Sequence, residues 1–165
     1  MTLSITVPGD PETQGSMKAF VRGKRAVVVH DESARLNFWR GLVAITARRA
    51  WGRAPRLDEP VALAVTFRLA RPAGHYGTGR NAGTVRPSAP ALPHKKPDLD
   101  KLVRAIGDAL TEAGIWADDS RVVQLTATKV YAGPGEEPGV DVTVAPLGGI
   151  SQCRHDVVTS TSLAA

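Results

Sequence analysis

Four aspartates in the second half of the sequence are spaced in a way that suits binding of a divalent metal ion. Asp98 and Asp100 bracket the start of a predicted helix, and Asp118 and Asp119 lie in the turn after its end. Carboxylate oxygens are the hard ligands that Mg²⁺ prefers, and Mg²⁺ can activate water for attack on a phosphate ester. The four acids are therefore candidate metal ligands for phosphodiester hydrolysis.

Basic side chains flank the first pair of acids, at Lys95, Lys96, Lys101 and Arg104. Cations at these positions can bind a scissile phosphate and neutralise the charge that develops on it during hydrolysis. The combination of acids and bases predicts a site that acts on a phosphate backbone.

A purely structural interpretation of the same aspartates stays open. Asp98 could cap the helix, Asp100 would be favoured there by the helix dipole, and an ion pair to Arg104 would explain both. Asp118 and Asp119 also form a common turn sequence. Residue 101, where a capping box would place Glu or Gln, is Lys, which favours the functional interpretation.

The two aspartate pairs must come together for a metal site to form. A helix of about 15 residues is ~22 Å long, and the segment from Gly114 to Asp119 can run back at most ~17 Å. Side chains and one metal ion can bridge the remaining ~5 Å. One chain can complete the site if the turn at Gly114 is tight; otherwise a symmetry-related chain must supply one pair.

The charge distribution indicates a polyanionic partner. Residues 1–104 carry 18 Lys and Arg against 8 Asp and Glu, whereas residues 105–165 carry 3 against 8. Segments without acidic residues, such as 13–30 and 68–96, attract polyanions, of which nucleic acid is the commonest. Basic loops without a partner are the alternative. The candidate DNA-binding side chains are Lys18, Arg22, Lys24, Arg25, Arg71, Arg80, Arg86, Lys95, Lys96 and Lys101.

Other classes of protein lack their usual signatures here. The longest apolar stretch, residues 61–70, is about half of the ~20 residues that a membrane helix needs. Cys153 is the only cysteine, which excludes an internal disulfide framework and fits a reducing cytoplasm. We find no phosphate-binding glycine loop, serine-hydrolase elbow or zinc-protease helix, and we expect neither membrane contact nor an organic cofactor.

The hydrophobic periodicity predicts one domain of mixed strands and helices, residues 1–146, followed by a frayed tail, residues 147–165. Trp39 and Trp116 should lie in its core. Residues 71–97 are rich in Pro and Gly and should form a long loop. We expect strands at 3–7, 61–69, 123–131 and 140–144, a hairpin of 19–21 and 26–29, and helices at 33–51 and 99–113.

The segment around the aspartates resembles a known family. Residues 96–114 (KPDLDKLVRAIGDALTEAG), followed by Trp116-Ala117-Asp118-Asp119, are similar to the core motif of the RusA family of Holliday-junction resolvases. The resemblance implies an α/β (α+β) domain with a mixed sheet and two main helices, assembled as a homodimer. It also implies an endonuclease that uses Mg²⁺, or Mn²⁺ in its place, to nick four-way DNA junctions symmetrically.

The resemblance further implies which residues act. The three catalytic acids of the family match Asp98, Asp100 and Asp119, with Asp118 adjacent. The family commonly has Asn directly after the second acid and Lys four residues after it, whereas this chain has Lys101 and Arg104. Arg104 keeps the positive charge for phosphate binding, but it stays protonated and does not suit a role that needs a titrating lysine.

Three functional hypotheses follow. The first is resolution of Holliday junctions in DNA recombination and repair, in the cytoplasm of a bacterial or phage-infected cell, by a dimer whose two-fold symmetry matches that of the junction. The second is a nuclease that prefers flaps or replication forks. The third is a non-catalytic DNA-binding module in which the acids are only caps and turn residues.

Overall fold

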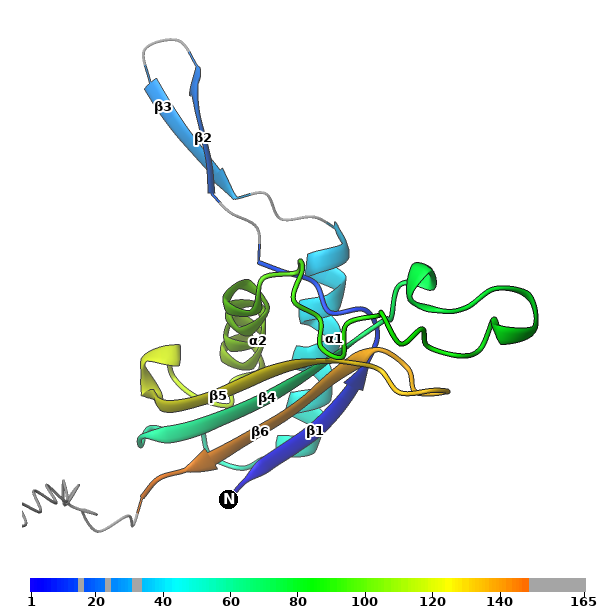
Figure 1. Cartoon of the computed structure of the whole chain (residues 1–165). Coiled ribbons are helices and arrows are strands. Elements are labelled where there is room, and N and C mark those ends of the chain that lie inside the picture. Colours follow the sequence, from blue (N-terminus) through cyan, green and yellow to red (C-terminus); the bar gives the residue numbers. More distant parts are fainter. Residues whose placement is uncertain (15–16, 23–24, 31–33, 149–165) are drawn as a thin grey trace, which may run out of the picture.

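The computed structural model describes residues 1–14, 17–22, 25–30 and 34–148, and it describes no side chains between residues 15 and 33. A four-stranded sheet carries two long helices, α1 (Ala34–Trp51) and α2 (Leu99–Ala113), on one face (Figure 1). The strands run in the order β1 (Leu3–Pro8), β6 (Gly139–Pro146), β4 (Val61–Leu69) and β5 (Val122–Tyr131). The expected mixed sheet with two main helices in one domain is confirmed.

The sheet is mixed because of one helical crossover. β6 pairs antiparallel with both β1 and β4, whereas β4 pairs in parallel with β5. Parallel neighbours need a long connection, and here the connection contains residues 71–97 and α2. The crossover therefore brings the end of α2 to the start of β5, which is where Asp118 and Asp119 lie.

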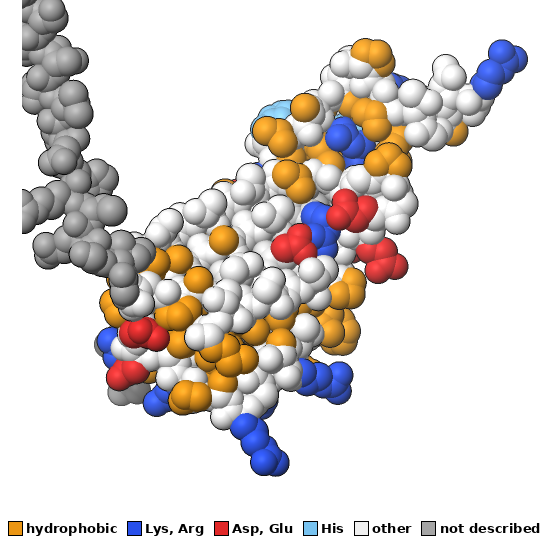
Figure 2. Space-filling view, turned by 90° about the horizontal axis from the view of Figure 1, so that it is seen from below, with side chains coloured by type: hydrophobic (Ala, Val, Ile, Leu, Met, Phe, Trp, Pro, Cys, Tyr) orange, Lys and Arg blue, Asp and Glu red, His pale blue; other side chains and the backbone are white. Residues whose placement is uncertain are grey.

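The buried faces follow the sequence periodicity. In β4 the apolar residues at alternate positions are all buried, and in α1 the buried residues Leu36, Trp39, Val43 and Ala47 recur at helical spacing. Trp39 and Trp116 lie in the core as expected. The opposite face of the sheet carries apolar, polar and charged side chains, and no helix of the described residues covers it (Figures 1 and 2).

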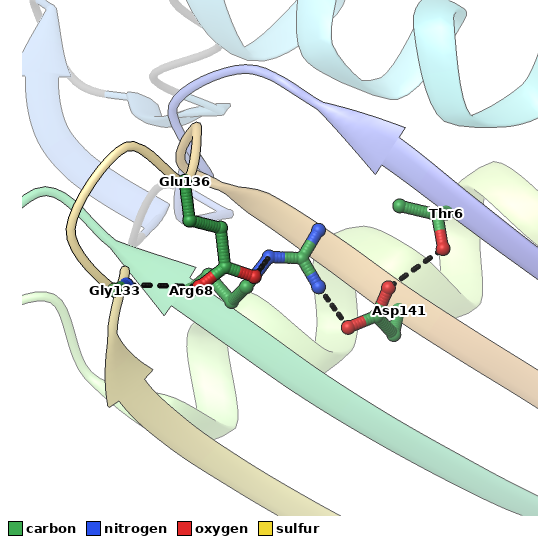
Figure 3. A network of polar contacts seen from close by, with 5 residues as sticks. All are labelled: Thr6, Arg68, Gly133, Glu136 and Asp141. Carbon is green, nitrogen blue, oxygen red and sulfur yellow. Dashed lines mark hydrogen bonds and ion pairs between the residues drawn. The ribbon is translucent and has the colours of Figure 1, made fainter.

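A polar network ties three strands together at one end of the sheet (Figure 3). Arg68 on β4 forms ion pairs with Glu136, at 3.0 Å, and with Asp141 on β6. Asp141 also accepts a hydrogen bond of 2.8 Å from Thr6 on β1, and Glu136 accepts one of 2.8 Å from the backbone of Gly133. Arg68 belongs to an acid-free segment of the sequence, but tertiary contacts neutralise it.

Two parts of the chain project from the sheet and its helices (Figure 1). The predicted hairpin is confirmed as β2 (Met17–Arg22) paired with β3 (Arg25–His30). The long loop at residues 71–97 is confirmed too, and it has internal structure: two short 3₁₀ turns, at Ala73–His75 and Gly79–Asn81, and a bridge between Tyr76 and Val85.

Some expectations fall on parts that the structure does not describe. Lys24 lies outside the described residues, as do the side chains of Lys18, Arg22 and Arg25. Residues 149–165 are also outside them, so the boundary between a domain at 1–146 and a tail at 147–165 stays a prediction. Neither described helix has the length and apolar character needed to cross a bilayer.

Candidate active site

The start of α2 leaves the carboxylate of Asp98 available for polar contacts. Asp98 is the N-cap residue, and its carbonyl accepts the first helical bond, from the N–H of Leu102 at 3.1 Å. Its carboxylate caps no backbone N–H and instead forms an ion pair of 3.1 Å with Lys101. The capping interpretation of this side chain is therefore wrong.

The end of α2 forms the tight turn that a single-chain site requires. Gly114 ends the helix in the left-handed conformation, with φ of 75°, which glycine adopts without strain. Trp116 follows, fully buried, and its indole N–H donates a hydrogen bond of 2.8 Å to the hydroxyl of Thr111. This anchor fixes where the chain leaves the core and so positions the next two residues, Asp118 and Asp119.

Asp118 acts as a turn residue. Its carboxylate accepts a hydrogen bond of 2.9 Å from the N–H of Ser120 and caps the 3₁₀ turn Asp119–Arg121. Hydrogen bonds from the side chain and the backbone of Ser120 lower the pKa of the Asp118 carboxyl below its ordinary value. The structural interpretation is thus confirmed for Asp118, whereas its role as a metal ligand stays a prediction.

Asp100, Arg104 and Asp119 line one pocket, of about 320 Å³, which we call the acidic pocket. Asp100 and Arg104 come from one face of α2, and Asp119 comes from the turn before β5. The remaining lining residues are Leu63, Val103, Gly107, Val122 and Leu125. One chain therefore brings together an acid from each predicted pair.

The third predicted catalytic acid, Asp98, is not among the residues that line the acidic pocket. Asp98 lines a separate pocket of about 350 Å³ with Thr13, Lys96, Pro97 and Lys101. Residues two apart at the start of a helix are turned by roughly 200° about its axis, so Asp98 and Asp100 diverge. In the described part of the chain no three acids, histidines or cysteines group closely enough to hold a metal ion, so the convergence of Asp98, Asp100 and Asp119 stays a prediction.

Gly107 is a site residue that the sequence analysis missed. It lies about two helical turns beyond Asp100, and a Cβ at this position would lie 3.9 Å from the Cβ of Asp119. A bare helix backbone here leaves the acidic pocket open between Asp100 and Asp119. The signal in the sequence was a glycine inside a strong helical pattern, where it costs ~1 kcal/mol relative to Ala.

Lys129 is a second missed residue, on β5. Its ammonium donates hydrogen bonds of 2.8 Å to the carbonyl of Lys95 and 2.7 Å to that of Pro97. The residue after Pro97 is Asp98, so Lys129 holds the segment that leads into α2. No local pattern could have identified it, because its partners lie more than 30 positions earlier in the chain.

The predicted DNA-binding cations take different roles. The Arg71 guanidinium lies 4.2 Å from the ring centre of Tyr131 and donates to the carbonyl of Pro90, so it stabilises the loop. Arg80, Arg86, Lys95 and Lys96 are exposed. Lys96 and Lys101 line the same pocket as Asp98, whereas Arg104 lines the acidic pocket.

The fold and the pocket define a class of protein. Carboxylates beside an arginine, in an open pocket at the edge of a sheet, are typical of enzymes that hydrolyse phosphodiesters. The chain belongs to the RusA endodeoxyribonuclease family, because the family model described as Endodeoxyribonuclease RusA matches residues 8–145.

Individual relatives match to different extents. The uncharacterized protein YqaN of Bacillus subtilis strain 168 is 29% identical over 150 residues, which cover 86% of this chain and 94% of that protein. The crossover junction endodeoxyribonucleases RusA of Escherichia coli K12 and of Enterobacteria phage 82 are each 37% identical over 54 residues. That match covers 33% of this chain and 43% of each relative, so it spans less than half of their length.

Substitutions at Gly107 test whether the acidic pocket is the reaction site. Gly107→Ala should keep DNA cleavage and raise the stability by up to ~1 kcal/mol, since the new methyl group makes an ordinary contact and improves helix propensity. Gly107→Leu should abolish cleavage, because its side chain fills the space between the two acids. The matched control is Gly41→Leu on α1, where a Cβ meets no atom within 4 Å. A folded Gly107→Leu variant with full activity would contradict this placement.

Lys129→Met tests whether the hydrogen bonds from Lys129 to the carbonyls of Lys95 and Pro97 position the start of α2. Loss of two charge-assisted hydrogen bonds on a partly buried side chain should cost about 1 kcal/mol, or ~2–4 °C in melting temperature. Cleavage should fall by much more, up to ~10²-fold, because small displacements of reacting groups are costly. Lys129→Arg, which can still donate to both carbonyls, should restore most of the activity. A fully active Lys129→Met variant would show that these hydrogen bonds do not position the catalytic residues.

Proposed function

We propose that this protein resolves four-way DNA junctions by hydrolysing phosphodiester bonds with Mg²⁺, and that Asp98, Asp100, Asp119 and Arg104 form its site. The observation that carries the proposal is the acidic pocket, where Asp100 and Asp119 from separate segments meet Arg104. The names of the relatives in Escherichia coli and phage 82 support the choice of a branched DNA substrate.

The donor set suits Mg²⁺. This ion commonly binds through one or two carboxylates and keeps several waters or takes phosphate oxygens as its remaining ligands. Asp100 and Asp119 are both exposed and line a pocket with room for such a hydrated ion. A bound Mg²⁺ supplies Lewis-acid chemistry for the attack of water on phosphorus; Mn²⁺, which accepts similar ligands, is expected to substitute.

Arg104 supplies fixed positive charge. Its guanidinium can bind a non-bridging phosphate oxygen and neutralise the charge that grows as the water oxygen bonds to phosphorus. The attacking water gives up a proton to solvent, the bond from phosphorus to the 3′ oxygen breaks, and that oxygen takes up a proton from solvent, which leaves a 5′-phosphate and a 3′-hydroxyl. Arg104 does not lose a proton under working conditions, so its contribution is electrostatic.

Asp98 can join the other acids at low cost. Its ion pair with Lys101 is partly exposed, with 47% and 36% of the two side chains accessible, and such surface pairs contribute about 0–1 kcal/mol. Arrival of a phosphate beside Lys96 and Lys101 gives both lysines a new anionic partner and releases the Asp98 carboxylate. The acid then turns toward the metal-binding side of α2.

A homodimer would give the two matching cuts that a two-fold symmetric junction requires. β5 is the edge strand of the sheet, and on it Val123 and Leu125 are 63% and 52% exposed. A long edge strand with exposed apolar residues favours pairing with another chain. We place the second copy along this edge, next to the acidic pocket.

Asp100→Asn and Asp119→Asn test the catalytic proposal. Each should reduce cutting of a four-way junction in Mg²⁺ by at least ~10²-fold, the usual size of losing one charge-stabilising group, while binding persists. Glu137→Gln, an exposed acid in the turn before β6, is the matched control and should cut normally. Asp98→Asn should behave like the other two site variants if Asp98 joins the metal site.

The outcomes separate the three hypotheses. If Asp100→Asn and Asp119→Asn both cut as fast as the wild-type protein, the proposed catalytic site is wrong. Absence of cutting by the wild-type protein, with intact and salt-sensitive binding, would favour a DNA-binding module. Faster cutting of flaps or forks than of junctions would favour the second hypothesis.

Val123→Lys tests the dimer. Light scattering should give the wild-type protein twice the chain mass of 17.5 kDa, and the variant should be a monomer because a charge at the centre of an apolar contact is costly to desolvate. Leu92→Lys, at a site in the loop that is 60% exposed, is the control and should remain dimeric. A dimeric Val123→Lys variant would place the interface elsewhere.

A further inference from the structure

A larger pocket, of about 490 Å³, lies beside the pocket that contains Asp98. We call it the loop pocket, because residues of the long loop form most of it, with the ends of β4 and β5 as its floor. Its volume is in the range of small-ligand sites. The family resemblance does not account for it, and none of the proposed catalytic residues lines it.

The walls of the loop pocket are apolar and held in place. Leu69, Pro72, Pro90 and Pro93 contribute apolar surface, and Tyr131 lies among them. The Tyr131 ring is fixed from two directions: the guanidinium of Arg71 covers it at 4.2 Å, and the ring of His75 meets it edge to face with ring centres 5.5 Å apart. The Tyr131 ring is therefore held in one orientation in the wall of the pocket.

The rim of the loop pocket is basic. His94, Lys95 and Lys96 line it and are exposed, and no acidic residue is among the lining residues. The ligand that suits this combination has an apolar planar part and an anionic part, as a nucleotide does. Bases stack on aromatic and apolar surfaces, and phosphates bind lysines.

The loop pocket is connected to the pocket that contains Asp98 through shared residues. Lys96 and Pro97 line both the loop pocket and the pocket that contains Asp98. Lys129 binds the carbonyls of Lys95 and Pro97, so this shared wall is braced from β5. A phosphate on Lys96 would lie between the two pockets.

We propose that the loop pocket receives one unstacked nucleotide of the bound DNA, with its base against the prolines and Tyr131 and its phosphate on Lys95 and Lys96. The proposal rests on the proposed function, because it takes the substrate to be branched DNA. Unstacking a base costs a few kcal/mol in a duplex and least where stacking is already interrupted, as it is at a branch point. The pocket therefore favours cutting close to the branch.

A pair of glycine variants tests the proposal. Gly74 lines the loop pocket and Gly83 lies elsewhere in the same loop; a Cβ on either meets no atom within 4 Å, and neither has a positive φ. Gly74→Leu should fill the pocket, whereas Gly83→Leu should not. Equal melting temperatures of the two variants and the wild-type protein would show that neither change disturbs the fold.

The probe is a four-way junction with 2-aminopurine at one nucleotide near the branch, moved position by position, in EDTA so that no cutting occurs. Stacking quenches the fluorescence of 2-aminopurine. With the wild-type protein and with Gly83→Leu, emission should therefore rise severalfold when the probe is at one particular position, and the same position should respond on the symmetry-related strand. Gly74→Leu should lose that rise and bind about tenfold more weakly, the loss expected for one stacked base.

Two results would overturn the proposal: no position that brightens with the wild-type protein, or equal brightening with Gly74→Leu. In the second case Lys95 and Lys96 contact only the phosphate backbone. Either result leaves the junction-cutting assay of the aspartate variants unaffected. Conversely, a wild-type protein that captures a base but never cuts would refute the catalytic proposal alone.

Discussion

The packing of α2 against the start of β5 is the contact on which the candidate site depends. The parallel pairing of β4 with β5 requires a crossover, and α2 is that crossover. Gly107 has no side chain to hold the next segment away, so Asp119 approaches the helix two turns beyond Asp100. Two acids that are 19 positions apart thereby share one pocket with Arg104.

Fewer cations are available to a DNA backbone in the folded chain than a count of Lys and Arg suggests. Arg68 is neutralised by Glu136 and Asp141, and Arg71 is committed to Tyr131 and Pro90. The cations that remain exposed beside the acids are Lys95, Lys96 and Arg104. Positive charge is therefore available where a phosphate backbone would meet the carboxylates, and Arg80 and Arg86 add exposed charge elsewhere in the loop.

The segment that leads into α2 connects the loop pocket with the pocket that contains Asp98, because Lys96 and Pro97 line both. It is held by Lys129 from β5 and by the backbone of Gln14, which donates to the carbonyl of Lys101 at 3.1 Å. Within the described part of the chain, the Asp98 carboxylate is restrained by a partly exposed ion pair with Lys101. A rigid backbone with one weakly held acid allows the side chain to change partner without movement of the helix.

The sequence by itself determined the elements and the candidate residues. Apolar spacing defines β4 and α2 because burial of one face requires it, and the motif around Asp98, Asp100 and Asp119 indicated the family. Tertiary structure decided which acids meet: Asp100 joins Asp119, Asp98 faces Lys101, and Asp118 caps a turn. Helical rotation and long-range contacts such as those of Lys129 set these outcomes, and neither is encoded in a local pattern of residue types.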